Sequence, residues 1–247
     1  MRALLSALVS LLLPPCIVKN TLLRLSGWKI GDGCRIGFSF IRADTINLQE
    51  GSRVGNLNFI SLQCIILRQS ASIGHLNKIT GPFILALEDK AAVGNENRVI
   101  RAPRTVSWGR SMLRLKFNSK ITSGHVIDCT RPVIFSSNSI LAGRGSQIWS
   151  HGYLHAREGT GRFRIDGSVF IGNNVYIGSS SVINAGVNIC SGATIGSGSC
   201  VSRSITRSGL YVGQALRYLP LDFDEAAARY PTVKAGNLVE TVKIKKR

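Results

Sequence analysis

The sequence of 247 residues is poor in acidic residues, in proline and in charge overall. Asp and Glu number 13 against 31 Lys and Arg, which gives a formal net charge of +18. Because only 18% of the residues are charged and 44% are hydrophobic, an intrinsically disordered chain is excluded. Seven prolines accompany 26 glycines, a balance that favours the tight turns of an all-β protein over a helical bundle.

Closely spaced cysteines are also lacking. The six cysteines lie far apart and form no C-x-x-C pair, whereas zinc knuckles and disulfide frameworks require tighter spacing. We therefore expect reduced thiols, a cytoplasmic location and no bound metal. The positive charge implies anionic partners, but the basic residues are scattered and no nucleic-acid-binding module is recognisable, so nucleic acid is not an expected partner.

The N-terminus lacks an apolar run that could span a bilayer. Residues 3–13 are apolar, but the stretch is too short and is followed at once by two prolines. It also lacks the small-x-small cleavage pattern of a signal peptide. We interpret residues 1–27 as an apolar helix and a basic amphipathic segment, which either lies peripherally on the inner face of a membrane or only caps the core.

Aliphatic residues recur at every sixth position in the C-terminal half. The series is Ile165, Ile171, Ile177, Ile183, Ile189, Ile195 and Val201. A period of six fits neither an amphipathic helix nor a simple strand. If each hexad makes one flat side, three hexads close a triangular coil, and Ile165, Ile183 and Val201 stack inside it. The pattern thus predicts a β-solenoid with continuous aliphatic columns.

The same pattern is present earlier, with interruptions. Ile36, Val54, Ile73 and Val93 are each followed by glycine, and the steps between them are 18, 19 and 20 residues. We expect one coil per step and a solenoid over residues 28–205. The rhythm breaks at 101–125 and 151–164, and loops extruded from a solenoid usually lie on its binding face. Residues 206–247 are predicted to hold a short helix at 222–230 and a disordered basic tail at 243–247.

Three sequence stretches carry a family resemblance. FIGNNVYIGS at 170–179, VINAGV at 182–187 and ATIGSGS at 193–199 resemble the hexapeptide-repeat acyltransferases, most of all the sugar O-acetyltransferases of surface-polysaccharide and lipopolysaccharide synthesis. The specific match covers residues 121–205. The resemblance implies a left-handed parallel β-helix, with the hand resting on the resemblance alone. It also implies acetyl-CoA as the thioester donor, a sugar or lipid-linked sugar as acceptor, and a homotrimer with active sites between subunits.

Acyl transfer to a hydroxyl needs a base, and histidine is suited to that role at neutral pH. The sequence has four histidines, His75, His125, His151 and His155. The resemblance assigns the general base to His151, in QIWSHGY at 147–153, about twenty residues before the FIGNNVYIGS stretch. His155 competes for the role, whereas His75 follows a hexad corner and is expected to be a surface turn residue.

The remaining site predictions also follow from the resemblance. His125, Asp128 and Trp149 are predicted to lie on the acceptor side. For Asp128, orienting a histidine, binding sugar hydroxyls and a plain turn role all stay open. The residues predicted to bind the coenzyme are Tyr176, Ser179, Ser197, Ser202 and Arg203, and for Tyr176 a packing role stays equally open. Ser179 and Ser197 would stack on neighbouring coils and line the pantetheine slot, while Cys190 departs from the glycine that the repeat normally has.

A basic segment and two other functions complete the expectations. Residues 101–120 hold six basic and no acidic residues, which makes either a solvated face or a contact for an acidic membrane or a lipid-linked sugar diphosphate. A gamma-type carbonic anhydrase shares the expected fold, but the histidine spacing does not match its metal ligands. A non-catalytic binding solenoid is the other alternative, and the histidine-bearing loop at 147–153 argues against it.

Overall fold

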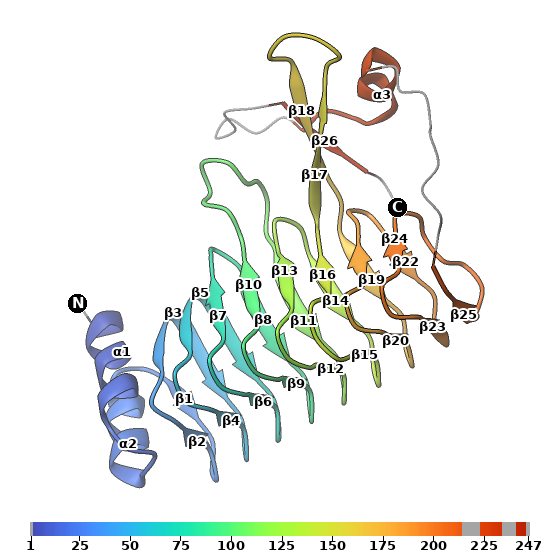
Figure 1. The fold of residues 1–247 in the computed structure, drawn as a ribbon. Coiled ribbons are helices and arrows are strands. Elements are labelled where there is room, and N and C mark those ends of the chain that lie inside the picture. The colour runs from blue at the N-terminus through green and yellow to red at the C-terminus, as the bar shows by residue number, and fades with distance from the viewer. Residues whose placement is uncertain (1, 214–222, 234–240, 246–247) are drawn as a thin grey trace.

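A computed structural model describes residues 2–213, 223–233 and 241–245. Two helices, α1 (Arg2–Leu12) and α2 (Ile17–Leu25), precede a solenoid of short strands (Figure 1). Each strand of the solenoid pairs in parallel with the coil before it or after it. The fold is therefore the all-β parallel β-helix that the hexad period predicts. Among the described residues, none of the helices has both the length and the apolar character needed to cross a bilayer.

The strands lie on three faces. The first face holds β2 (Arg35–Ile36), β4 (Arg53–Val54), β6 (Ser72–Ile73), β9 (Ala92–Val93), β12 (Lys120–Ile121), β15 (Ile140–Leu141), β20 (Tyr176–Ile177), β23 (Ala193–Ile195) and β25 (Gly209–Tyr211). The second face begins with the first halves of β3 (Phe40–Leu48) and β5 (Phe59–Leu67) and continues with β7 (Lys78–Thr80), β10 (Arg98–Ile100), β13 (Val126–Asp128), β16 (Gln147–Ile148), β21 (Val182–Ile183) and β24 (Cys200–Val201). The third face holds β1 (Lys29–Ile30), the second halves of β3 and β5, β8 (Ile84–Leu87), β11 (Met112–Leu115), β14 (Val133–Phe135), β19 (Val169–Ile171) and β22 (Asn188–Ile189).

The core consists of aliphatic columns, because the strands of the coil turn alternate side chains inward and the inward ones stack in register. On the first face Ile36, Val54, Ile73 and Val93 stand in register on successive coils, and none is more than 5% exposed. Burying one such side chain contributes about 1.5–3 kcal/mol, so the columns stabilise the coil along its length. The predicted one-coil steps between these residues are confirmed.

One predicted column is wrong at its first position. The predicted pairs that the structure confirms are Ile171 with Ile189, Ile177 with Ile195 and Ile183 with Val201. Ile165, however, is half-buried on β18 (Arg162–Asp166), outside the coil, and the residue in register with Ile183 is Ile148. The hexad spacing continued by coincidence into an extruded segment, where antiparallel pairing decides the side-chain direction instead.

Two segments leave the coil where the rhythm breaks. Residues 101–111 form a loop, after which Leu113 and Leu115 return to the core on β11. Residues 151–166 form an antiparallel hairpin of β17 (His151–His155) and β18, which rises from the solenoid as an arm (Figure 1).

The C-terminal segment departs from the prediction of a disordered tail. β26 (Val242–Ile244) adds to β18 in parallel, and Val242 is fully buried. Two apolar residues, Val242 and Ile244, among basic ones are a weak strand signal, and the partner strand supplies the missing stabilisation. The short helix is α3 (Phe223–Arg229), while residue 222 lies outside the described residues. β25 extends the coil to Tyr211, beyond the predicted end at 205.

Candidate active site

The candidate site lies at the root of the arm, at the corner between the second and third faces. β16 ends at Ile148, and the next two residues carry the chain out of the coil into β17. The chain returns at Gly167, whose N–H donates to the carbonyl of Ser150 over 2.9 Å. A Cβ at Gly167 would lie 2.4 Å from the nitrogen of Gly186, so only glycine permits this close return. The backbone that carries the His151 side chain is therefore held in one position.

His151 and Asp128 form a hydrogen-bonded pair. The Nδ1 of His151 lies 2.8 Å from the Oδ2 of Asp128, which ends β13 on a preceding coil. The same carboxylate oxygen accepts from the N–H and the hydroxyl of Ser150, at 3.0 and 2.5 Å. Its other oxygen accepts from the N–H and the hydroxyl of Thr130, at 3.1 and 2.8 Å. Asp128 is 2% exposed, so five donors hold one buried carboxylate in place.

The pKa values of the pair shift in opposite directions. Burial raises the pKa of Asp128, but its hydrogen bonds from His151, Ser150 and Thr130 outweigh burial, and the net pKa lies below the usual value. Burial lowers the pKa of His151, but the hydrogen bond and charge of Asp128 raise it by more, so the net pKa lies above the usual 6.5. An ionised Asp128 thus fixes the proton on Nδ1 of the neutral imidazole and leaves Nε2 as the basic nitrogen. Among the described residues, none hydrogen-bonds to Nε2.

Aromatic rings flank the imidazole. Trp149 and Tyr153 pack edge-on against His151, with ring centroids 6.2 and 5.9 Å away. The indole N–H of Trp149 donates to the Oε1 of Gln147 over 2.9 Å, which fixes its orientation. His155 lies farther along β17, with its ring centroid 6.5 Å from that of Tyr153, while Asp128 hydrogen-bonds to His151. The structure thus places Trp149 beside His151, which leaves its predicted acceptor role a prediction, and His155 on the outer part of the arm.

A second buried carboxylate ties the arm to the 101–111 loop. Asp166 stands directly opposite His151 in the hairpin and pairs with Arg164 through an Nε–Oδ1 contact of 2.7 Å. The indole N–H of Trp108 in the loop donates to the other oxygen of Asp166 over 2.8 Å. The guanidinium of Arg131 covers the Trp108 ring, 3.9 Å from its centroid. Sequence reasoning missed this cluster; the one available signal was the Arg-Asp alternation on β18, which reads equally well as a solvated strand.

His125 lies inside the coil, contrary to its predicted place on the acceptor. It is 1% exposed and belongs to a ladder of polar side chains at the corner between the first and second faces. Its N–H donates to the Oδ1 of Asn97, which itself follows Asn77 in the ladder. Nδ1 accepts from the N–H of Ser146, and Nε2 lies 3.0 Å from the hydroxyl of Thr122. Burial lowers the pKa of His125 to about 4, so the ring is neutral and structural.

The predicted coenzyme residues fall into two groups. Ser179 and Ser197 stack at the corner between the first and second faces, where the N–H of Gly198 donates to the Ser179 carbonyl over 2.8 Å. Tyr176 lies beside them on β20, 46% exposed. The other group, Ser202 and Arg203, follows β24 at the second-to-third-face corner, on the same edge of the coil as His151. Within one chain the second face separates Ser179 and Ser197 from His151.

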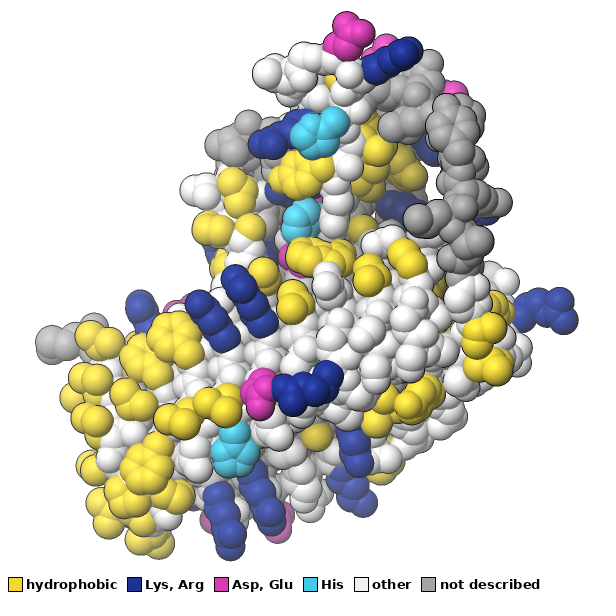
Figure 2. Space-filling model, viewed as in Figure 1, with side chains coloured by type: hydrophobic (Ala, Val, Ile, Leu, Met, Phe, Trp, Pro, Cys, Tyr) yellow, Lys and Arg dark blue, Asp and Glu magenta, His cyan; other side chains and the backbone are white. Residues whose placement is uncertain are grey.

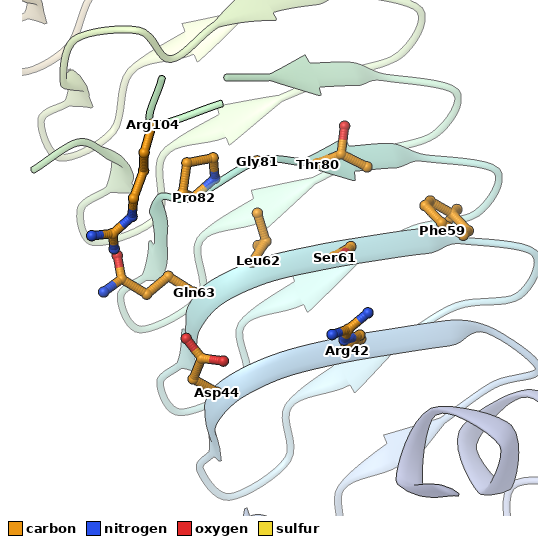
Figure 3. A pocket seen from close by; sticks show the side chains of 10 residues that line it. All are labelled: Arg42, Asp44, Phe59, Ser61, Leu62, Gln63, Thr80, Gly81, Pro82 and Arg104. Carbon is orange, nitrogen blue, oxygen red and sulfur yellow. The ribbon is translucent and has the colours of Figure 1, made fainter. Parts of the chain in front are cut away.

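A separate hollow lies nearer the N-terminus. It encloses about 460 Å³ against the bends of β3 and β5 (Figure 3). Arg42 and Asp44 line it from β3, Gln63 from β5 and Arg104 from the 101–111 loop. It contains no histidine, and its lining is distinct from the His151–Asp128 pair. Across the described ranges, no three His, Cys, Asp or Glu side chains are grouped as a metal site.

Comparisons with known proteins identify folds of this kind among acyltransferases. Neither a family model nor a curated protein matches the chain. The crystallised polysialic acid O-acetyltransferase OatWY is 15% identical over 82% of this chain and 92% of its own, with a TM-score of 0.47. AntD, an N-acyltransferase from Bacillus cereus solved with dTDP and 3-hydroxybutyryl-CoA, is 14% identical over 85% and 92%, with a TM-score of 0.42. The polySia-specific acetyltransferase NeuO is 18% identical over 66% and 81%, with a TM-score of 0.36.

Proposed function

We propose that this chain is an acyltransferase that moves an acetyl group from acetyl-CoA to a hydroxyl of a sugar, in a surface glycan or its lipid-linked precursor. The observation that supports the proposal most directly is the His151–Asp128 pair at the root of the arm. Nε2 of His151 takes the proton of the acceptor hydroxyl as its oxygen attacks the thioester carbonyl. The carbon–sulfur bond then breaks, and the proton passes from His151 to the departing thiolate.

Transfer is direct, without an acyl-enzyme, because the nearby nucleophiles are occupied or inaccessible. The hydroxyl of Ser150 donates to Asp128 rather than to His151, and Ser150 is fully buried, so the three residues do not form a nucleophilic triad. Cys129 is also fully buried, and burial raises the pKa of its thiol well above the usual value. A hydroxyl and a thiol in these states are poor attackers of a thioester.

A neighbouring copy would complete the site. Ser179 and Ser197 of one copy would line the pantetheine slot, and the slot would face His151 on the adjoining copy, since one chain keeps them at different corners. In a homotrimer such heterologous contacts form a closed ring, so that every contact surface is paired. Ser202 and Arg203, at the edge that carries His151, would meet the phosphate end of the coenzyme, where a guanidinium binds oxygens in pairs.

The reaction can be tested with isotopically labelled acetyl-CoA and a panel of oligosaccharides, with mass spectrometry of the products. We expect one labelled acetyl ester per modified sugar, no transfer by His151→Ala and unchanged transfer by the exposed-residue control Leu210→Gln. Binding of acetyl-CoA without transfer to any acceptor, or labelled acetyl retained on the protein, would refute direct transfer to a sugar.

The shared site can be tested by mixing two inactive variants. His151→Ala removes the base, and Ser197→Tyr blocks the slot at the exposed end of the stack. If a site combines residues from two copies, mixed oligomers regain activity because some interfaces keep both intact residues. Mixtures that stay as inactive as the separate variants, with trimers shown by light scattering, would place the complete site within one chain.

A further inference from the structure

The first helix presents the wrong face to solvent for a surface helix of a soluble protein. α1 packs its small residues, Ser6, Ala7 and Ser10, against the coil, and all three are at most 4% exposed. Its leucines point away: the exposed ones are Leu4, Leu5, Leu8 and Leu12, from 41% to 67%. Because a surface helix normally buries its leucines, this arrangement leaves its apolar face without a partner in the chain.

The second helix repeats the inversion in part. α2 buries Leu23 in the core, but it also buries Lys19, whose Nζ donates to the carbonyls of Ser10, Leu13 and Gly37 at 2.7, 2.9 and 2.8 Å. The first two carbonyls belong to the C-terminal end of α1, so the ammonium caps that helix and fixes the two helices to each other and to the coil. The residues that α2 exposes are Ile17, Val18, Leu22 and Leu25, up to 80%. The apolar face is thus held outward by specific buried contacts.

Exposed leucines also occur at the corner of the coil next to the helices. Leu57 and Leu76 occupy successive turns with φ of 58° and 60°, a left-handed conformation that is costly for leucine, and they are 65% and 53% exposed. Farther along this corner the left-handed positions are held by Glu96, Gly124 and Ser180. Neither conformation nor solvation favours leucine at the first two turns. A partner that buries these two side chains would offset both the conformational cost and the cost of exposing them to water.

These residues form one surface, which we call the N-terminal patch. It comprises the eight exposed residues of α1 and α2 together with Phe38, Leu57, Phe59 and Leu76. Figure 2 shows hydrophobic side chains gathered over this end of the solenoid, with Lys and Arg side chains along the border. Phe59 stacks on Phe40, and the next residues in that column of the second face are Lys78 and Arg98.

The charges around the patch select its partner. Arg24 and Lys29 are exposed beside the patch, with Arg24 3.8 Å from Asp32, and the exposed Lys78 and Arg98 follow Phe59 along the second face. A symmetric contact between two copies would bring these like charges together, which is unfavourable. An anionic lipid surface, by contrast, attracts each basic residue near it and solvates the leucines in its acyl region.

We propose that the N-terminal patch docks the protein on an anionic membrane. α1, with 11 residues, is about 16 Å long, half the hydrocarbon thickness, so it lies in the plane of the interface. The patch lies at one end of the solenoid and the His151 arm rises farther along it (Figure 1), so docking leaves the arm in water. The proposal does not depend on the proposed acyl transfer.

Co-sedimentation of the full chain with vesicles tests docking. We expect binding to vesicles of phosphatidylcholine with phosphatidylglycerol and much weaker binding to phosphatidylcholine alone, with the anionic binding decreasing as salt is raised. Leu4→Gln with Leu8→Gln should lower the partition coefficient by about a hundredfold, because both side chains are exposed and enter the acyl region. The matched control, Leu210→Gln with Val212→Gln at the opposite end of the coil, should bind like the wild type.

A second pair of variants separates docking from folding. Leu57→Asn with Leu76→Asn places a residue that tolerates the left-handed conformation at both turns, so the melting temperature should hold or rise while vesicle binding decreases about tenfold. The proposal would be overturned if the wild type did not bind anionic vesicles, or if the Leu4→Gln, Leu8→Gln variant bound them as well as the wild type does. Concentration-dependent association lost in the Leu4→Gln, Leu8→Gln variant, without vesicle binding, would assign the patch to a second copy instead.

Discussion

His125 is buried and His151 is half-buried, yet their surroundings shift their pKa values in opposite directions. His125 hydrogen-bonds to neutral groups, the amide of Asn97, the N–H of Ser146 and the hydroxyl of Thr122. Burial, with a smaller contribution from the charge of Arg144, lowers its pKa to about 4. His151 contacts the carboxylate of Asp128, which reverses the effect of burial and raises its pKa. The difference shows that burial alone does not decide the pKa of a histidine, because an ionised partner reverses the effect of burial.

The largest expected effect separates the two histidines by activity. His151→Ala should lower kcat by about a hundred- to ten-thousandfold, the usual contribution of a positioned general base. Binding of acetyl-CoA should change little, because the predicted slot lies along the coils. His125→Asn should keep kcat near the wild-type value, since asparagine already fills the equivalent ladder positions at Asn77 and Asn97. Comparable losses in both variants would mean that the two histidines do not differ in role.

The next largest effect is the difference between the two histidines in how their contribution to stability depends on pH. Unfolded His125 titrates near 6.5 and folded His125 near 4, so the unfolded chain binds more protons between these values. Stability is therefore lost as pH falls from about 6.5 to 4, by about 3 kcal/mol for this one group. His151 has the opposite sign: its raised pKa contributes stability at low pH that is lost as pH rises through the folded value.

Urea unfolding at several pH values measures the difference. His125→Asn should abolish its share of the acid-side loss, about 3 kcal/mol between pH 6.5 and 4, and leave stability at pH 7 nearly unchanged. His125→Ala should instead destabilise the fold by about 3 kcal/mol at pH 7, because it leaves the N–H of Ser146 unpaired and opens a cavity. An acid-side slope that persists in His125→Asn would show that another group is responsible.

The smallest effect concerns the support of the arm. Trp108→Phe keeps an aromatic ring under Arg131 but removes the hydrogen bond to Asp166. Because Arg164 still pairs with Asp166, we expect a loss of about 1 kcal/mol in thermal unfolding and a change in kcat of only a few-fold. A loss of activity as large as that of His151→Ala, with the fold intact by circular dichroism, would place Trp108 in the reaction itself.

Sequence reasoning predicted the solenoid well because its cause is local and periodic. The aliphatic residue at each sixth position has one way to reach a core, and the register of Ile171 with Ile189 follows from it. Ile165 shows where this fails: one hexad match inside an extruded hairpin has the same spacing but another partner. The hexad spacing therefore does not predict which residues lie outside the coil.

The candidate site was predicted less completely because its contacts join distant segments. His151 was predicted from a short stretch, but its bond to Asp128 spans 23 residues, and Asp128 had three open roles. His125, near Asp128 in sequence, faces the interior at a different corner, which sequence distance does not show. The link between Trp108 and Asp166 spans 58 residues and has no sequence signal of its own.

The pH dependence of kcat/KM in the wild type and in Asp128→Asn tests the central claim most directly. If His151 must be unprotonated and Asp128 raises its pKa, wild-type activity should rise with pH through an apparent pKa above 6.5, and Asp128→Asn should shift that limb to lower pH. The variant should also lose activity at every pH, because the imidazole is no longer held by a carboxylate. An unshifted limb in Asp128→Asn, or a limb that disappears on replacing Cys129, would contradict the assignment of His151 as the base.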